Sequence, residues 1–171
     1  METDWIPSLW QDTFDDMLEE ELEYNDSWAF QFNYSLQEDL SKQEKRRGWK
    51  IYCHCAYGHF RCDTCSKTWP SARVVVLFHY RLRSGTDRGT VIMRPFGQAC
   101  RRCDGDYQLP GFSTQEVENV LLKLFSKIRK NCYGEEEEED SDSCASDKVW
   151  TKPHESSLCE ACSQGICCTD D

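Results

Sequence analysis

The fold of this chain is decided by residues 60–103, FRCDTCSKTWPSARVVVLFHYRLRSGTDRGTVIMRPFGQACRRC, in which two Cys-x-x-Cys pairs bracket two strand-like runs. Residues 73–80 are β-branched and aromatic and predict a buried strand. Residues 90–96 predict the returning strand, because a turn rich in Gly and Ser separates the two runs. An antiparallel return brings the chain back to the end of the sheet where it began. We therefore expect Cys65 and Cys100 to lie at the same end of the sheet.

Three further elements are predicted outside this stretch. Residues 8–23 place apolar side chains at helical spacing opposite a face of acidic ones, which predicts an amphipathic helix with Ser8 as its N-cap. Residues 49–57 alternate with a period of two and predict a strand. A second helix should begin after Ser113 and end at Gly134, because Ser is a favoured N-cap and Gly a favoured helix terminator.

Cysteine chemistry is the strongest functional signal. The chain has twelve cysteines and begins without the apolar segment of a secretory signal, so we expect reduced thiols and metal ligation rather than a disulfide framework. Two intervening residues let both sulfurs of a Cys-x-x-Cys pair turn toward one ion at about 2.3 Å, the Zn–S distance. The pattern predicts Zn²⁺, two ions per chain. Three Cys-x-x-Cys pairs make up this pattern, namely Cys62/Cys65, Cys100/Cys103 and Cys159/Cys162.

The first two pairs should share one tetrahedral site, because the predicted hairpin brings them together. The third pair leaves two arrangements open. It can join one imidazole and one more thiolate in a second site of its own, or it can complete a site begun by an earlier pair. The candidate metal ligands are Cys62, Cys65, Cys100, Cys103, His154, Cys159, Cys162 and Cys167.

The remaining cysteines receive plainer interpretations. Cys53 and Cys55 share one strand face, where core packing is expected, and Cys132 should pack at the end of its helix. The sequence contains no P-loop, no Gly-x-Ser-x-Gly and no His-Glu-x-x-His motif. Closed zinc sites and these absences predict a protein that is not an enzyme.

Charge is strongly segregated along the chain. Residues 1–41 hold twelve acids and no Lys or Arg, residues 42–134 hold eighteen bases and seven acids, and residues 135–171 hold twelve acids and two bases. The expected organisation is an acidic helix and polar segment (1–44), a zinc-binding core (45–134), an acidic disordered linker (135–152) and a C-terminal zinc-ligand segment packing on the core (153–171). Such charge blocks are typical of ordinary solvated surface, and the alternative is that the basic middle meets an acidic partner or the chain's own arms.

The expected fold class is α+β. It comprises a zinc-stabilised, zinc-ribbon-like antiparallel sheet, an N-terminal amphipathic helix and a helix after the second knuckle, where a knuckle is the turn that carries one Cys-x-x-Cys pair. The longest dense apolar run, residues 74–78, is far shorter than the about 20 residues of a membrane span. We therefore expect a cytoplasmic protein that can be peripheral on the endoplasmic reticulum or plasma membrane through a receptor or a lipid.

Motifs spread over residues 5–168 resemble those of the receptor-transporting protein family, with its zinc domain of three Cys-x-x-Cys pairs. The motifs that carry the resemblance are Phe60-Arg61-Cys62-x-x-Cys65, Trp69-x-Ser71-Ala72, Val74-x-Val76-Leu77-Phe78-His79, Gly89-x-Val91-x-Met93-Arg94-x-Phe96-Gly97-Gln98-x-Cys100-x-x-Cys103, Lys130-x-Cys132-Tyr133-Gly134 and His154-x4-Cys159-Glu160-Ala161-Cys162-x-x-Gly165-x-Cys167. Many members of that family end in a hydrophobic membrane anchor. Because no such segment precedes Asp171, we expect either a soluble member without the anchor or a truncated form.

The resemblance implies a chaperone-like accessory protein that binds G-protein-coupled receptors of the chemosensory type, such as olfactory receptors, and promotes their targeting to the plasma membrane. Its expected contact surface is basic and aromatic and meets receptor loops or anionic lipid headgroups. The residues of that surface are Lys45, Arg46, Arg47, Trp49, Arg101 and Arg102. The alternative is a nucleic-acid-binding zinc protein of innate antiviral defence, which the basic middle segment with its interleaved aromatics motivates.

Overall fold

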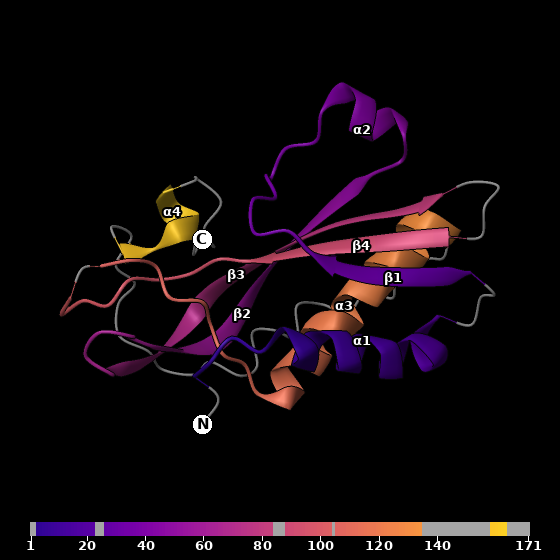
Figure 1. The fold of residues 1–171 in the computed structure, drawn as a ribbon. Helices are drawn as coiled ribbons and strands as arrows, with labels where there is room; N and C mark the ends of the chain where they lie inside the picture. The colour runs from indigo at the N-terminus through magenta and orange to yellow at the C-terminus, as the bar shows by residue number, and fades with distance from the viewer. Residues whose placement is uncertain (1–2, 23–25, 84–87, 104, 135–157, 164–171) are drawn as a thin grey trace.

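A computed structural model describes residues 3–22, 26–83, 88–103, 105–134 and 158–163. Its centre is a four-stranded sheet in the order β1-β4-β3-β2 (Figure 1). The strands are β1 (Ser27–Phe32), β2 (Lys50–Arg61), β3 (Thr68–Arg83) and β4 (Arg88–Pro95).

The predicted meander is present, and it is longer than the sequence pattern indicated. β2 pairs with β3 and β3 pairs with β4, both antiparallel. Residues 74–78 are fully buried because both faces of β3 are covered. The predicted α+β fold is therefore confirmed.

β1 was not predicted, and it makes the sheet mixed rather than purely antiparallel. This strand pairs parallel to β4, with Trp28 opposite Gly89. A Cβ atom at Gly89 would lie 2.3 Å from the Trp28 ring. The indole ring therefore requires glycine at this position of β4.

Two helices cover one face of the sheet (Figure 1). They are α1 (Pro7–Glu21) and α3 (Thr114–Tyr133), which pack on each other and on the strands. The core beneath them includes the buried rings of Trp10 and Phe14 and the α3 residue Phe125, which stacks on Phe14 with ring centroids 5.2 Å apart.

The helix ends agree only partly with the sequence prediction. Ser113 caps α3 by accepting a hydrogen bond from the Glu116 amide at 3.2 Å, and Gly134 ends the helix with a φ of 69°. The expected cap at Ser8 is wrong. The N-cap is Ile6, because Pro7, with its fixed φ, takes the first helical position.

The opposite face of the sheet carries two short helices, α2 (Lys42–Arg46) and α4 (Glu160–Ser163). A second buried cluster lies on this face, where Val75 and Leu77 of β3 pack with Leu36, Phe96, Cys159 and Ala161. None of the helices in the described part of the chain is long and apolar enough to cross a membrane.

Candidate metal centre

Four cysteine sulfurs converge where the ends of two hairpins meet. Cys62 and Cys65 follow β2, Cys100 and Cys103 follow β4, and all four sulfurs lie within 4.8 Å of one another. The Sγ atoms of Cys65 and Cys100 are 3.8 Å apart. Four sulfurs bound tetrahedrally at the Zn–S distance would be separated by about 3.8 Å. The donor set therefore fits a zinc ion, and the predicted pairing of the first two Cys-x-x-Cys pairs is supported by the geometry.

Backbone amides favour thiolate formation at the first pair. The Thr64 N–H donates to the Cys62 Sγ at 3.4 Å, and the turn is closed by the Cys62 N–H donating to the Lys67 carbonyl at 2.8 Å. Hydrogen bonds from the Cys65 and Thr64 amides lower the pKa of Cys62 to about 6. This sulfur is thus prepared to act as an anionic ligand near neutral pH.

The four thiols cannot all ionise without a cation. Hydrogen bonds between the Cys103 thiol and the sulfurs of Cys65 and Cys62, together with burial, raise the pKa of Cys103 to about 12. Opposite shifts within one cluster are the behaviour of like charges that repel at short range. A bound divalent cation would remove this conflict, because the metal stabilises every thiolate at once.

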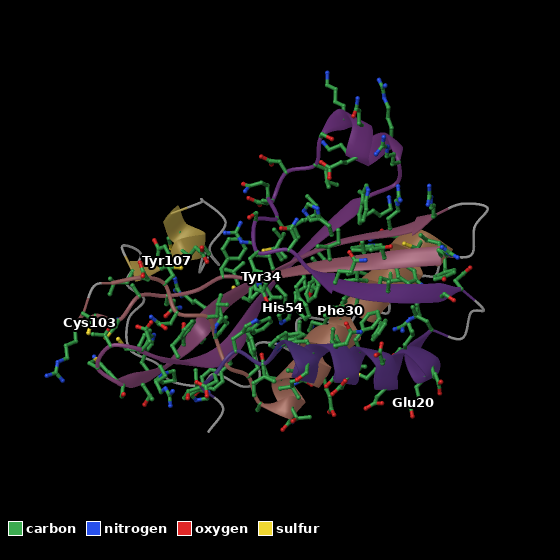
Figure 2. All side chains as sticks on the ribbon, viewed as in Figure 1. Glu20, Phe30, Tyr34, His54, Cys103 and Tyr107 are labelled. Atoms are coloured by element: carbon green, nitrogen blue, oxygen red, sulfur yellow. The ribbon has the colours of Figure 1, made fainter. Side chains whose placement is uncertain are left out.

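A polar link fixes the two knuckles relative to each other. The Trp69 Nε1 donates to the Gln98 Oε1 at 3.1 Å, and the Gln98 Nε2 donates to the Ser71 Oγ at 2.9 Å. Phe60 stacks on the Trp69 ring with centroids 5.4 Å apart. Gln98 therefore ties the segment before the second knuckle to β3, and Figure 2 shows Cys103 at this end of the molecule. Sequence reasoning did not assign this supporting role to Gln98.

The third pair, Cys159 and Cys162, lies on the face of the sheet away from α1 and α3. Within the described residues it does not join the four-sulfur cluster. Cys159 is buried, and its Sγ accepts a hydrogen bond from the Cys162 amide at 3.4 Å, as the Cys62 sulfur does from Thr64. The pair is docked on the segment before Cys100, because the Ala99 N–H donates to the Leu158 carbonyl at 2.7 Å. This placement favours a separate site for the third pair over an interleaved one.

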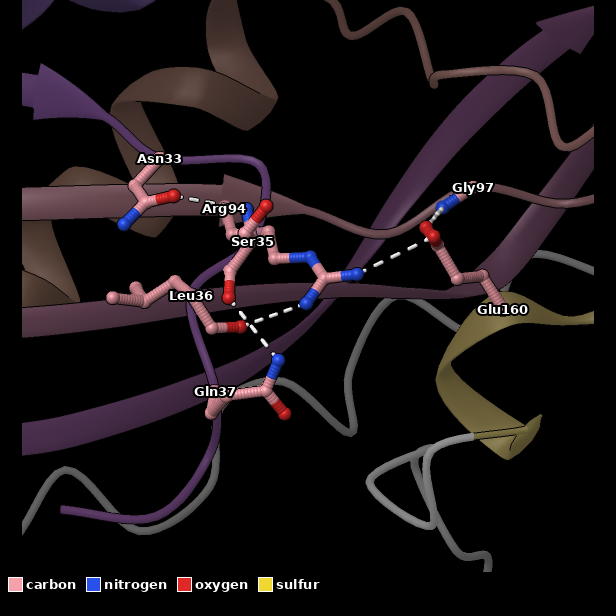
Figure 3. A network of polar contacts seen from close by, with 7 residues as sticks. All are labelled: Asn33, Ser35, Leu36, Gln37, Arg94, Gly97 and Glu160. Carbon is pink, nitrogen blue, oxygen red and sulfur yellow. Dashed lines mark hydrogen bonds and ion pairs between the residues drawn. The ribbon is translucent and has the colours of Figure 1, made fainter. Parts of the chain in front are cut away.

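A buried arginine anchors the third pair (Figure 3). The Arg94 guanidinium donates to the Leu36 carbonyl at 2.8 Å and to the Glu160 Oε2 at 3.3 Å. The other Glu160 oxygen accepts from the Gly97 amide at 2.9 Å. Glu160 lies inside the Cys159-x-x-Cys162 motif, so β4, the loop at residue 36 and the third pair are joined by one network.

The remaining predicted ligands and cysteines have different outcomes. His154 and Cys167 lie outside the described residues, so their assignment as ligands stays a prediction. The prediction that Cys53 and Cys55 pack in the core is wrong, because both side chains are exposed on β2. Cys132 does pack against the main core.

The nine cysteines of the described residues are not all reduced. Cys55 is disulfide-bonded, whereas the other eight form no disulfide. The expectation of reduced thiols therefore holds at the four-sulfur cluster and at the third pair, and it fails at Cys55.

Comparison with known proteins agrees with the chemistry of the site. A family described as a zinc-binding domain, a zinc ribbon with three Cys-x-x-Cys pairs, matches residues 55–165. No solved structure matches the chain.

Curated relatives match most of the chain. Human receptor-transporting protein 4 is 34% identical over 92% of this chain and 63% of its own length. Mouse receptor-transporting protein 1 is 34% identical over 92% of this chain and 58% of its own length, and mouse receptor-transporting protein 2 is 36% identical over 82% and 62%. This chain thus spans about three fifths of the length of these relatives. With its zinc-binding domain and its similarity to these proteins, the chain belongs to the receptor-transporting protein family.

Proposed function

We propose that this protein is a zinc-dependent accessory protein that binds G-protein-coupled receptors of the chemosensory type and promotes their targeting to the plasma membrane. The observation that carries the proposal is family membership, since the relatives that match most of the chain are named receptor-transporting proteins. The proposed partners are membrane receptors, and the proposed action is chaperone-like binding rather than catalysis.

The metal centre supports a structural role for zinc. Four sulfur ligands complete a tetrahedral shell and leave no position for a substrate or an activated water. Because structural zinc sites contribute directly to folding free energy, the metal would hold the two hairpin ends as one rigid platform. A rigid platform is the feature that a binding protein requires.

One edge of the sheet offers a surface suited to a receptor segment. β1 is an edge strand, and its outward residues Ser27, Ala29 and Gln31 carry no charge. Edge strands without charge or proline are open to pairing with an added strand. We infer that an extended cytoplasmic segment of the receptor pairs with this edge.

Aromatic side chains continue this edge beyond the strand. The Trp5 ring lies against Phe32 with centroids 5.6 Å apart, and the Trp5 Nε1 donates to the Tyr34 hydroxyl at 3.0 Å. Tyr34 is 48% exposed, and the neighbouring Ile6 is 38% exposed. These side chains would supply apolar contact area next to the main-chain pairing.

The test is co-expression with a panel of poorly trafficked chemosensory receptors, with surface receptor measured by flow cytometry and association measured by co-purification. We expect the full chain to raise surface receptor and the Cys62→Ser/Cys100→Ser variant to fail. Tyr34→Ala should weaken association. Tyr107→Ala should not, because this tyrosine, which is 40% exposed, lies away from Tyr34 (Figure 2). No increase for any receptor, with empty co-purifications, would refute the proposal.

A further inference from the structure

A dense group of basic side chains surrounds α2, on the face of the sheet opposite α1 and α3 (Figures 1 and 2). Four of them are exposed on α2 and its C-cap, and the others come from the adjoining ends of β3 and β4. We name this group the α2 patch. It consists of Lys42, Lys45, Arg46, Arg47, Arg81, Arg83 and Arg88.

Local structure holds α2 in place as a projection from the sheet. Ser41 and Glu44 form a reciprocal capping box, with the Glu44 amide donating to the Ser41 Oγ at 3.1 Å and the Ser41 amide donating to the Glu44 Oε1 at 3.0 Å. Gly48, with a φ of 92°, turns the chain from α2 into β2. Trp49 then lies beneath Arg81, whose Cζ is 4.9 Å from the indole ring centroid. This contact ties α2 to the end of β3.

The basic side chains on α2 and at its C-cap are exposed to solvent. Across the described part of the chain, the four basic residues of α2 and its C-cap form no ion pair with an acidic side chain. The acid within α2, Glu44, is engaged in the cap, which lowers its pKa. In addition, Arg83 lies opposite Arg88 in the β3–β4 register, an arrangement of like charges that costs stability.

The opposite side of the sheet carries an acidic helix face. The exposed face of α1 presents acids at five positions, and Figure 2 shows Glu20 pointing away from the sheet on the side of α1. These acids are Asp12, Asp15, Asp16, Glu19 and Glu20. The exposed face of α1 is therefore acidic, whereas α3, on the same side of the sheet, carries Lys123, Lys127 and Lys130.

We propose that the α2 patch docks the protein on the anionic lipid surface of a membrane. An extended plane of negative charge attracts the α2 patch and repels the acidic face of α1, so it would favour the orientation in which α2 meets the membrane. A projecting short helix can reach a flat surface, whereas sites for single-stranded nucleic acid are grooves lined with stacking rings. The nearest large ring, Trp49, is already covered by Arg81. Membrane contact through this patch does not require receptor binding.

The sequence grouped Arg101 and Arg102 with the arginines of α2, but the structure separates the two pairs. Arg101 and Arg102 are exposed beside Cys103, at the end of the molecule away from α2 (Figures 1 and 2). Both pairs consist of adjacent exposed arginines, so Arg46→Gln/Arg47→Gln and Arg101→Gln/Arg102→Gln remove equal charge from two different surfaces. They form a matched test and control.

The experiment is co-sedimentation of the full zinc-loaded chain with vesicles of phosphatidylcholine alone or with about 30% phosphatidylserine. Each Lys or Arg near an anionic surface strengthens partitioning about fivefold, so we expect Arg46→Gln/Arg47→Gln to weaken binding about 25-fold. The Arg101→Gln/Arg102→Gln control should change binding less than about threefold. Binding should also fall steeply as salt rises from 50 to about 300 mM.

Several results would overturn the proposal. They are equal binding to vesicles with and without phosphatidylserine, no binding to either, and equal losses for the two double variants. Release of the chain from the vesicles by an RNA oligomer at micromolar concentration would instead assign the patch to nucleic acid. Zinc content and unfolding midpoint, measured for each variant, separate loss of lipid contact from loss of fold.

Discussion

Arg94 holds the third Cys-x-x-Cys pair against the sheet, and replacing it with Met should destabilise the zinc-loaded chain by about 3 kcal/mol. The charge-assisted bond to the Leu36 carbonyl accounts for about 2 kcal/mol. Loss of the pair with Glu160, whose side chain is 22% exposed, adds about 1 kcal/mol, the low end for a polar group left without its partner, because solvent reaches this carboxylate. The Met side chain retains the apolar volume beside Phe96, so little is added for a cavity.

The assay is urea unfolding at fixed zinc concentration, combined with hydrogen exchange at the Ala99 amide, which bonds to the Leu158 carbonyl. Faster exchange at this amide before global unfolding would show that α4 detaches first. The matched control is Arg61→Met. Arg61 pairs with Asp4 at 3.8 Å on the surface, and both side chains are more than half exposed, so its loss should cost less than about 1 kcal/mol. Equal costs for the two substitutions would refute a stabilising role for the buried network.

Three further substitutions test the fold around the site. Gly89→Ala should cost about 1–3 kcal/mol in urea unfolding, because the new methyl group meets the Trp28 ring, whereas Gly105→Ala, with open space around it, should be nearly neutral. Ser113→Ala should cost about 1 kcal/mol by removing the N-cap of α3, and an unchanged midpoint would contradict the capping geometry. Burial lowers the pKa of His54 to about 4, below the ordinary 6.5. Only the unfolded chain then gains a proton between those values, so stability falls as the pH drops through this window. His54→Gln should lose less stability than the parent over the same range, and an equal loss would contradict the assigned shift.

The sequence predicted the elements that have strong local signals. β3 was predictable because residues 74–78 are β-branched or apolar throughout, and α3 because Ser113 and Gly134 mark its ends. The convergence of Cys65 and Cys100 followed from the antiparallel return of two neighbouring strands. Each of these inferences depends on contacts between residues close in the sequence or joined by one hairpin.

The features that escaped prediction depend on contacts distant in the sequence. β1 pairs parallel with β4 across more than fifty residues, and no local pattern in residues 27–32 specifies that partner. The bond between Arg94 and Glu160 spans 66 residues and was likewise hidden. An arginine inside a strand and a glutamate inside a Cys-x-x-Cys motif both look like surface residues until the fold places them together.

The exposed position of Cys53 shows a further limit of periodicity. The alternation of apolar and polar residues in 49–57 correctly indicated a strand. It did not show how much of the strand face that carries Cys53 is covered by other segments. β2 is an edge strand, and the cover on that face comes from Leu36 and the third pair, which pack over β3. Burial on this face is therefore set by segments remote from β2.

The central claim is that two hairpin ends share one zinc ion, and native mass spectrometry of single and double cysteine variants tests it most directly. Cys62→Ser and Cys100→Ser should each lose one zinc ion relative to the parent chain, and the double variant should lose no more than either single one. Cys159→Ser, combined with Cys62→Ser, should lose a second ion, because the third pair lies outside the four-sulfur cluster. Loss of two ions from Cys62→Ser/Cys100→Ser would place the first two pairs in different sites and contradict the account.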